Sequence, residues 1–311
     1  YEPGAGRNCG LSQMRPQDER YAMAEEFLEV AYKLWEGSWA SDAFAGSKEQ
    51  RLFARPDRVR TIDHQGHFFS CSGPHVSFPS PQRTPLLIQA GWSPRGKSFG
   101  ARHAEVVFVG DSDPQAVQKG LEDIRRLAIA DGRDPRQIKA LTGLQIVVAE
   151  SRAAAEDKLN DYQQYYEPEA SLAAYSGWSG IDIAAYQDDE PLNKTSNHTQ
   201  SAAEKAPLLA GDVKKRYARV DGNSGLTFTG TPQDIADQIE DYVDQSGIDG
   251  FLLHQFISPG SFEDFASLVV PELIRRGRYR TTPHSGTLRS RLRDDSSDRL
   301  PADHPAARYR W

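Results

Sequence analysis

Residues 84–96, TPLLIQAGWSPRG, predict a short buried strand, a glycine turn and the start of a helix. The apolar run before Gly91 is too short for a helix and is bounded by Pro85, so it is typical of a strand. Ser93 is a helix-capping residue type, and Pro94 suits the first helical position, where no N–H is needed. Backbone N–H groups at that helix end would face outward and favour an anion. Such turns also occur without a ligand, and the spacing alone favours that alternative.

The same order of a short strand and then a helix recurs along the chain. Apolar runs of strand length occupy residues 105–109, 141–149 and 251–256, and segments with helical spacing follow them. Capping residues mark the helix starts, and these are Asp113 with Pro114, Ser151, the capping box 231–234, and Ser261. Four strand and helix units predict a parallel sheet with right-handed crossovers. A barrel and a doubly wound sheet would both fit, and four units are half of an eight-stranded barrel.

The whole chain, 1–311, is predicted to form a single domain with two insertions and a tail. An amphipathic helix near the start ends before Gly37, and the residues ahead of it look like a loop. Two stretches interrupt the alternation and are expected to be insertions: a polar, aromatic one at about 36–80 and a Tyr-, Ser- and Gly-rich one at about 162–226. The tail at about 278–311 is basic and then mixed in charge, which predicts an extended, solvated arm.

Composition indicates a globular protein whose partner is a small molecule. Hydrophobic residues make up 38% and charged residues 26% of the chain, which allows a sizeable core. The formal net charge of −7 disfavours nucleic acid or an anionic membrane as a partner. No G-x-G-x-x-G motif follows a predicted strand, which disfavours a dinucleotide site. Without a run long enough to span a membrane or a signal-peptide pattern, the chain is expected to be cytoplasmic.

The cysteines and histidines show no metal-binding pattern. Cys9 and Cys71 are too few and too far apart for a zinc cluster or a disulfide framework, so we expect two reduced thiols. His64, His67 and His75 lack the His-x-x-x-His spacing of a helical zinc site. We therefore expect no metal.

A series of segments, spread over nearly the whole chain, matches a set of family motifs in order. The segments are DERY (18–21), YKLWEGSW (32–39), SPQRTP (80–85), QAG (89–91), ARHAE (101–105), GTP (230–232), PGSFEDF (259–265), VPEL (270–273) and LPADHPAARYR (300–310). Together they resemble the flavin-dependent monooxygenases of the bacterial luciferase superfamily. The branch is the one that contains nitrilotriacetate, dibenzothiophene sulfone and long-chain alkane monooxygenases.

The resemblance implies a (β/α)8 TIM barrel with insertions, of which this chain looks like the C-terminal part without the first four βα units. In such enzymes a separate NAD(P)H-dependent flavin reductase supplies reduced FMN. The flavin reacts with O2 to a C4a-(hydro)peroxide and oxygenates a small organic substrate. The full-length form is expected to be a homo-oligomer. A half barrel by itself leaves sheet edges exposed and is expected to associate or to fold poorly. Two alternatives remain: a catalytically inactive flavin-binding fragment, and a deazaflavin-dependent oxidoreductase of the same superfamily.

The motifs also assign a flavin phosphate site. By the resemblance, Tyr21 would bond the FMN phosphate, and the turn after the first predicted strand would complete the cradle. The implied cofactor-binding residues are Tyr21, Gln89, Ala90, Gly91, Trp92 and Ser93. For Ser93, this agrees with the capping chemistry read from the residues alone.

Two departures from the family pattern bear on that site. Gln17 stands where the family commonly has His, which removes a charge-assisted contact. Trp92 stands where the family has a small residue, so its ring either crowds the turn or packs beside an intact backbone cradle. His254, near the end of the last predicted strand, is the candidate catalytic residue, because functional residues gather at the C-terminal ends of barrel strands. The alternative is a histidine that only fills the barrel or supports a loop.

Overall fold

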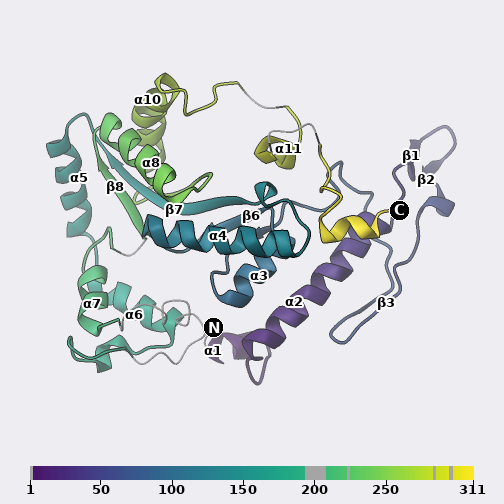
Figure 1. Ribbon diagram of the computed structural model, residues 1–311, viewed down its shortest axis with the longest axis horizontal. Helices are drawn as coiled ribbons and strands as arrows, with labels where there is room; N and C mark the ends of the chain where they lie inside the picture. Colours follow the sequence, from purple (N-terminus) through teal and green to yellow (C-terminus); the bar gives the residue numbers. More distant parts are fainter. Residues whose placement is uncertain (1–2, 193–207, 223–224, 283–284, 294–296) are drawn as a thin grey trace.

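A parallel sheet of five strands lies at the centre of the structure (Figure 1). The computed structural model describes residues 3–192, 208–222, 225–282, 285–293 and 297–311. The strands are β5 (Ile88–Gln89), β6 (Val106–Val109), β7 (Lys139–Val148), β8 (Leu226–Gly230) and β9 (Gly250–His254). Their order is β5-β6-β7-β8, and β9 pairs with β7. Every pairing is parallel, as the alternation of strands and helices predicts.

Strand β7 organises the sheet because its ten residues contact three other strands. Residues 139–142 pair with β6, 144–148 with β8, and 141–145 with β9. The overlap at 141–142 places β9 on the edge of β7 opposite to β6. In a barrel, consecutive strands are neighbours, so β9 would lie beside β8. The parallel α/β architecture is confirmed, whereas the expected barrel without its first four units is not.

Strand β8 was missed by the sequence prediction. It begins at residue 226, where the second insertion was expected to end. Its sequence, LTFTG, alternates between apolar and polar residues because Thr227 and Thr229 interrupt the run. That alternation is itself a strand signal, although it is shorter and weaker than the continuous runs of the other strands.

Helices follow the strands and begin where their capping residues predict. They are α3 (Pro94–His103), α4 (Pro114–Ala130), α5 (Arg152–Gln164) and α8 (Pro232–Ser246), capped by Ser93, Asp113, Ser151 and Thr231. Each capping side chain accepts a hydrogen bond from a first-turn N–H that has no partner within its helix. The cap expected at Ser261 is wrong, since α9 (Gly260–Asp264) begins after Pro259. The Ser261 hydroxyl accepts instead from the N–H groups of Phe256 and Ile257, both at 3.1 Å.

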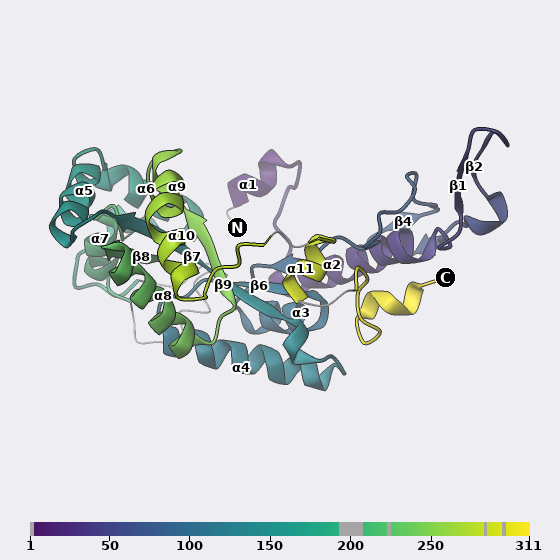
Figure 2. The ribbon, with the colours of Figure 1, turned by 90° about the horizontal axis from the view of Figure 1, so that it is seen from above.

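One face of the sheet is buried under helices and the other is partly open. Helices α4 and α8 lie on the same side of the sheet (Figure 2), and α9 continues through a π-helical turn, η5 (Phe265–Val269), into α10 (Val270–Arg275). The buried cluster includes Val107, Leu144, Ile146 and Phe228 of the strands with Val117, Leu121, Ile124, Ile235 and Leu273 of the helices. Burying a side chain of this size stabilises the fold by about 2 kcal/mol. Ile88 and Leu252 point to the opposite face and are 61% and 52% exposed.

The N-terminal helix α2 (Gln17–Tyr32) runs beside α3 toward the C-terminal segment (Figures 1 and 2). It continues as a π-helical turn, η1 (Lys33–Gly37), which ends at the glycine that the sequence marks as a stop. A short helix, α1 (Pro3–Asn8), lies ahead of it, where a loop was expected.

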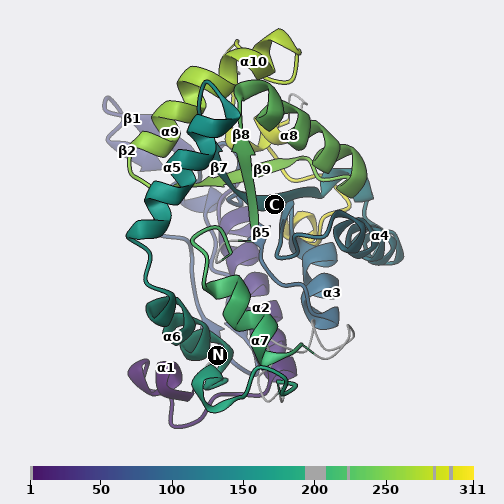
Figure 3. The same cartoon turned by 90° about the vertical axis from the view of Figure 1, so that its left-hand side faces the viewer.

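Small elements make up the segments expected to be insertions. Within 36–80, β1 (Phe44–Ser47) pairs with β2 (Leu52–Ala54) and β3 (His64–Gln65) with β4 (Ser70–Cys71), both antiparallel. The β1–β2 hairpin projects beyond α2 in Figure 2. Within 162–226 lie α6 (Pro168–Ser179), η4 (Ile183–Ala185) and α7 (Ala210–Tyr217), which pack around their own cluster of Tyr175, Ile183 and Tyr217. Figure 3 shows α6 and α7 below the sheet, and residues 193–207 lie outside the described part.

The C-terminal segment packs against α2 and is not the extended arm expected from its charge. It contains α11 (Leu288–Arg293) and a 3-10 helix, η6 (Pro305–Tyr309). Leu300 and Ala306 are buried in one cluster with Tyr32 of α2. The expectation failed because three arginines of this segment, Arg289, Arg299 and Arg310, pair with carboxylates of the fold, Glu105 and Glu36.

Arg289 of α11 shows this pairing most clearly, because its side chain is 0% exposed. Its guanidinium donates to both carboxylate oxygens of Glu105, at 2.6 and 2.9 Å, and to the carbonyls of Thr84 and Pro85, at 2.8 and 3.1 Å. Glu105 also accepts from the N–H of Leu87, at 3.3 Å. The buried ion pair therefore ties the C-terminal segment to the backbone that leads into β5.

Replacing Arg289 by Met is expected to destabilise the protein strongly. The change leaves the Glu105 carboxylate buried without its cation, which costs about 3–5 kcal/mol. Urea unfolding measures the loss, and Arg291→Met, which alters an exposed arginine of the same helix, is the matched control with a change within about 0.5 kcal/mol. The double variant Arg289→Met, Glu105→Met should recover much of the loss. Equal losses in Arg289→Met and the control would contradict this account.

Buried His304 makes stability depend on pH. Its Nε2 donates to the carbonyl of His103 at 2.9 Å, and its Nδ1 accepts from the N–H of Ala306 at 3.1 Å. Burial lowers the pKa of His304 from 6.5 to about 3, because desolvation penalises the charged imidazolium and the nearby Arg133 and Arg289 disfavour it as well. At pH values between these two, His304 is protonated in the unfolded chain but neutral in the folded chain. Stability contributed by this group therefore falls as the pH falls from 6.5 toward 3.

We expect His304→Asn to flatten that dependence. Asparagine keeps an acceptor for the Ala306 N–H but does not titrate. The wild type should lose about 1 kcal/mol of unfolding free energy per pH unit as the pH falls, and the variant should not show this loss. The variant should be less stable than the wild type at pH 7, because buried packing is lost, and the difference should shrink at pH 6, 5 and 4.5. Urea unfolding at each pH measures it. A difference that stays constant would show that His304 is not the titrating group.

Candidate functional site

The turn between β5 and α3 has the polar groups that an anion site requires. Ser93 caps α3, and its Oγ accepts from the N–H of Gly96 and from Nε2 of Gln17, both at 3.1 Å. A serine hydroxyl has two acceptor positions and one donor. With both acceptor positions used, the Ser93 O–H is the group left to donate. The cap therefore presents a hydroxyl donor at the positive end of the helix dipole.

Tyr21 of α2 reaches the same turn, as the motif match predicts. A Cβ added at Gly91 or at Gly96 would lie 2.8 Å from Tyr21 Oη, so the hydroxyl packs directly on both glycines. The Tyr21 ring is held against Phe99 of α3, with ring centroids 5.5 Å apart. A side chain at either position would collide with the Tyr21 hydroxyl, so glycine is required at both. The phenol hydroxyl can therefore lie beside the Ser93 cap. The structure brings these sequence-predicted residues together.

The remaining residues predicted for the cradle contribute in different ways. The side chain of Gln89 folds over Gly91, and Ala90 is exposed, so Ala90 offers only its backbone. The ring of Trp92 contacts Gly120 of α4, where a Cβ would collide with it, and packs against the central core. Of the two alternatives for Trp92, the structure has the packed ring and not one that crowds the turn.

His254 lies apart from this turn. It ends β9, is exposed, and rests on β7, where a Cβ added at Gly143 would lie 3.2 Å from His254 Nε2. Strands β6 and β7 separate β5 from β9, which corresponds to about 14 Å along the sheet at the usual strand spacing. Because the strands are parallel, His254 and the turn share the carboxyl edge of the sheet. The structure gives His254 no contact with the predicted phosphate residues.

A buried hydrogen-bonded chain joins α2 to α3 behind the turn. Tyr32 Oη lies 3.1 Å from His103 Nδ1, and His103 Nε2 lies 2.6 Å from a carboxylate oxygen of Glu25. Burial raises the pKa of Tyr32, so its hydroxyl stays protonated beside Nδ1. Partial burial opposes the ionisation of Glu25, but the His103 hydrogen bond and nearby arginines outweigh it and lower the pKa of this carboxyl. Glu25 is therefore a carboxylate, fixed in place by His103.

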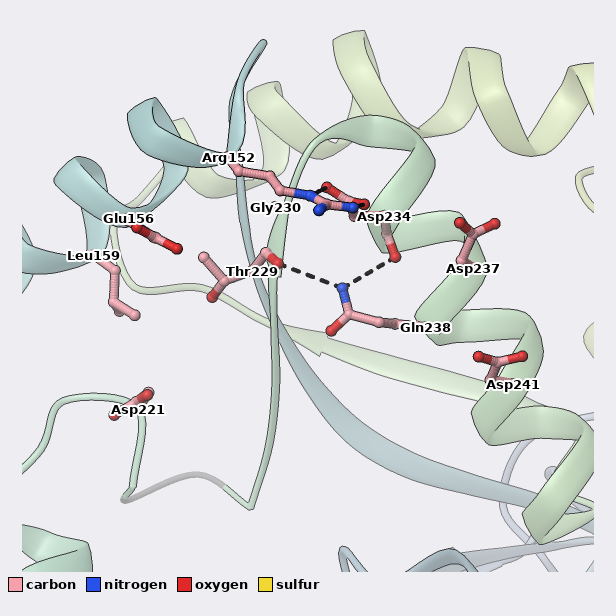
Figure 4. Close-up of a pocket in the computed structure, with 10 residues that line it drawn as sticks. All are labelled: Arg152, Glu156, Leu159, Asp221, Thr229, Gly230, Asp234, Asp237, Gln238 and Asp241. Atoms are coloured by element: carbon pink, nitrogen blue, oxygen red, sulfur yellow. Dashed lines mark hydrogen bonds and ion pairs between the residues drawn. The ribbon is translucent and has the colours of Figure 1, made fainter.

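A pocket of about 520 Å³ lies elsewhere, between α5 and α8 (Figure 4). Its polar lining is mostly acidic: Glu156, Asp221, Asp234, Asp237 and Asp241 with Arg152. Arg152 is bound to Asp234, and Gln238 donates to the Thr229 carbonyl, as Figure 4 shows. The carboxylates of this pocket repel a negatively charged phosphate. The pocket is therefore a poor anion site compared with the turn after β5.

Sequence reasoning missed two residues beside the turn. Gly96 and Arg95 occupy the first turn of α3, and their signal was present, since Ser93 and Pro94 had already fixed the helix start. In the described ranges, no group of three His, Cys, Asp or Glu side chains is placed to hold a metal. No helix in those ranges has the length and apolar character of a membrane span.

Comparisons with known proteins agree with the motif match. The family model for luciferase-like monooxygenases matches residues 5–250. A long-chain alkane monooxygenase of Geobacillus thermodenitrificans is 41% identical over 99% of this chain and 67% of its own length. Component A of the nitrilotriacetate monooxygenase of Aminobacter aminovorans is 32% identical over 92% of this chain and 65% of its own.

Solved structures show the same relationship. The crystal structure of a long-chain alkane monooxygenase superposes with a TM-score of 0.91 at 40% identity, over 99% of this chain and 68% of that one. A riboflavin lyase structure with modified FMN and riboflavin gives a TM-score of 0.90 at 36% identity, over 99% and 68%. The chain thus spans about two thirds of the length of these relatives.

The matches also test two expectations from the sequence. They run through as much as 99% of the chain, and the expectation that it is the C-terminal part of a family barrel is not borne out by them. The expected enzyme class, a flavin-dependent monooxygenase, is confirmed at the level of the family, because the relatives matched in sequence are named monooxygenases. The chain belongs to the luciferase-like monooxygenase family.

Proposed function

We propose that this chain holds the phosphate of reduced FMN at the turn after β5 and works as an FMN-dependent monooxygenase. The observation that carries the proposal is the convergence of the Tyr21 and Ser93 hydroxyls on Gly91 and Gly96 at the start of α3. Hydroxyl and backbone N–H donors at a helix N-terminus suit a phosphate, and the glycines allow the backbone to approach it. Bound reduced FMN would supply the electrons with which O2 oxygenates a small organic substrate.

The chain's own residues would bind and position the flavin. Ser93 and Tyr21 donate to the phosphate, while Gln89, Ala90, Gly91 and Trp92 supply the backbone of the turn. Gln17 holds the Ser93 hydroxyl through its amide at 3.1 Å, in place of the charged contact that a histidine could give. We keep His254 as the candidate catalytic residue, because it stands at the same edge of the sheet.

The partners follow from the same proposal. The relative named component A belongs to a monooxygenase of more than one component, which supports a separate NAD(P)H-dependent flavin reductase as a transient partner. We also propose a cytoplasmic, homo-oligomeric enzyme whose 1–311 segment is one domain. Oxygen consumption driven by reduced FMN and a reductase distinguishes this function from the two alternatives, deazaflavin-dependent hydride transfer and an inactive flavin-binding chain.

Ser93→Ala and Tyr21→Phe are expected to weaken binding of reduced FMN in anaerobic titrations. Each removes one hydroxyl donor to a charged phosphate, which is worth about 1.5–3 kcal/mol, or roughly a tenfold to hundredfold rise in Kd. Ser93→Ala also removes a helix cap, which costs about 1 kcal/mol of stability.

Ser151→Ala is the matched control, because Ser151 caps α5 in the same way, with Oγ 3.2 Å from the N–H of Ala154. It should lower stability like Ser93→Ala but leave the Kd for FMN unchanged. If the wild-type chain bound no reduced FMN, or if Ser151→Ala weakened binding as much as Ser93→Ala, the turn would not be the phosphate site.

A further inference from the structure

Arg95 lies in the first turn of α3, on the side of the turn where Tyr21 stands. Its guanidinium carbon is 5.8 Å from the centroid of the Tyr21 ring, and Nη2 is 3.8 Å from a carboxylate oxygen of Glu25. That separation exceeds a hydrogen bond, and the side chain is 38% exposed. Arginine carries five N–H donors in a planar fork. The residue thus lies between Tyr21 and Glu25, and part of its side chain stays exposed to solvent.

We propose that Arg95 supplies the positive charge that recognises the flavin phosphate, and so makes the site select FMN over riboflavin; this inference rests on the proposed function. The donors described at the turn, Ser93, Tyr21, Gln17 and the backbone, are all neutral. A phosphate monoester carries between one and a half and two negative charges at pH 7. An arginine fork matches two phosphate oxygens at once, which neutral hydroxyls cannot replace.

Lys97, two residues further along the same helix, is bound in a different way. Its ammonium nitrogen is 3.1 Å from an Asp123 carboxylate oxygen and 5.1 Å from the centroid of the Trp92 ring. Asp123 belongs to α4, and the Trp92 ring packs on α4 as well, so Lys97 is held on the α4 side. Of these two cations, Arg95 is therefore the one placed over the Tyr21 ring.

Glu25 positions Arg95 and does not neutralise it fully. Its carboxylate is held by His103 at 2.6 Å and also lies 3.9 Å from Arg102, so three cationic or hydrogen-bonding side chains share it. An exposed ion pair at such a distance contributes little energy. A dianionic phosphate can therefore compete for the Arg95 fork without breaking a strong interaction.

The experiment compares two flavins that differ only in the phosphate. The wild type, Arg95→Met and Lys97→Met are titrated calorimetrically, under anaerobic conditions, with reduced FMN and with reduced riboflavin. Arg95→Met should raise the Kd for FMN roughly tenfold to a hundredfold and leave the Kd for riboflavin within about twofold. Lys97→Met, which removes the same charge from the same helix, should change both by less than about threefold. Arg95→Lys should recover part of the lost FMN affinity, because it restores the charge without the fork.

Three results would overturn the inference, and they separate it from the proposed function. Equal weakening of FMN and riboflavin by Arg95→Met would assign Arg95 a merely structural role, since a disturbed fold does not discriminate between the flavins. If Lys97→Met lost as much FMN affinity as Arg95→Met, the effect would be general electrostatic attraction and not a specific contact of Arg95. A wild type that binds FMN and riboflavin equally refutes both this inference and the phosphate site at the turn, while flavin binding stands. A wild type that binds neither flavin instead refutes the proposed function as a whole.

Discussion

The buried ion pair between Arg289 and Glu105 fixes the part of the fold on which the candidate site depends. The guanidinium holds the carbonyls of Thr84 and Pro85, and the carboxylate holds the N–H of Leu87. This backbone runs directly into β5, which itself has only two residues and one neighbouring strand. So short an edge strand is poorly anchored by its own ladder. Its position, and that of the turn after it, is therefore set largely by a residue about two hundred positions later in the chain.

The difference between local and long-range interactions explains which parts of the fold could be predicted. The caps at Ser93 and Thr231 were predictable, because a capping side chain bonds to the backbone of its own helix within a few residues. The pairing of β9 with β7 was not, because it depends on which edge of a long strand is free. The C-terminal segment was misjudged for a related reason. The charge of this segment predicts that it is solvated. Arg289 is nevertheless buried, because it pairs with Glu105, and only the structure shows that partner.

The same distinction applies to the candidate site. The turn was recognisable from its own sequence, and the motif match added Tyr21, which α2 brings to it from the other side. The direction of the Trp92 ring could not be read from the sequence, because it depends on Gly120 of another helix. Arg95 was overlooked although its position in the first helical turn was already fixed. Its meaning depends on the Tyr21 ring beneath it, which only the structure shows.

An overall charge of −7 and a site for a phosphate are compatible because electrostatic recognition is local. Salt screens charges beyond about 8 Å at physiological ionic strength, so distant carboxylates hardly affect an anion at the turn. The acidic pocket between α5 and α8 illustrates the division, since its carboxylates are gathered away from α3. Neutral donors at the turn fix where an anion can sit, because their geometry is set by the backbone. A cation in the first turn of the same helix, Arg95, then decides how strongly the ligand's charge contributes to binding, and selectivity for a phosphorylated ligand depends on that charge.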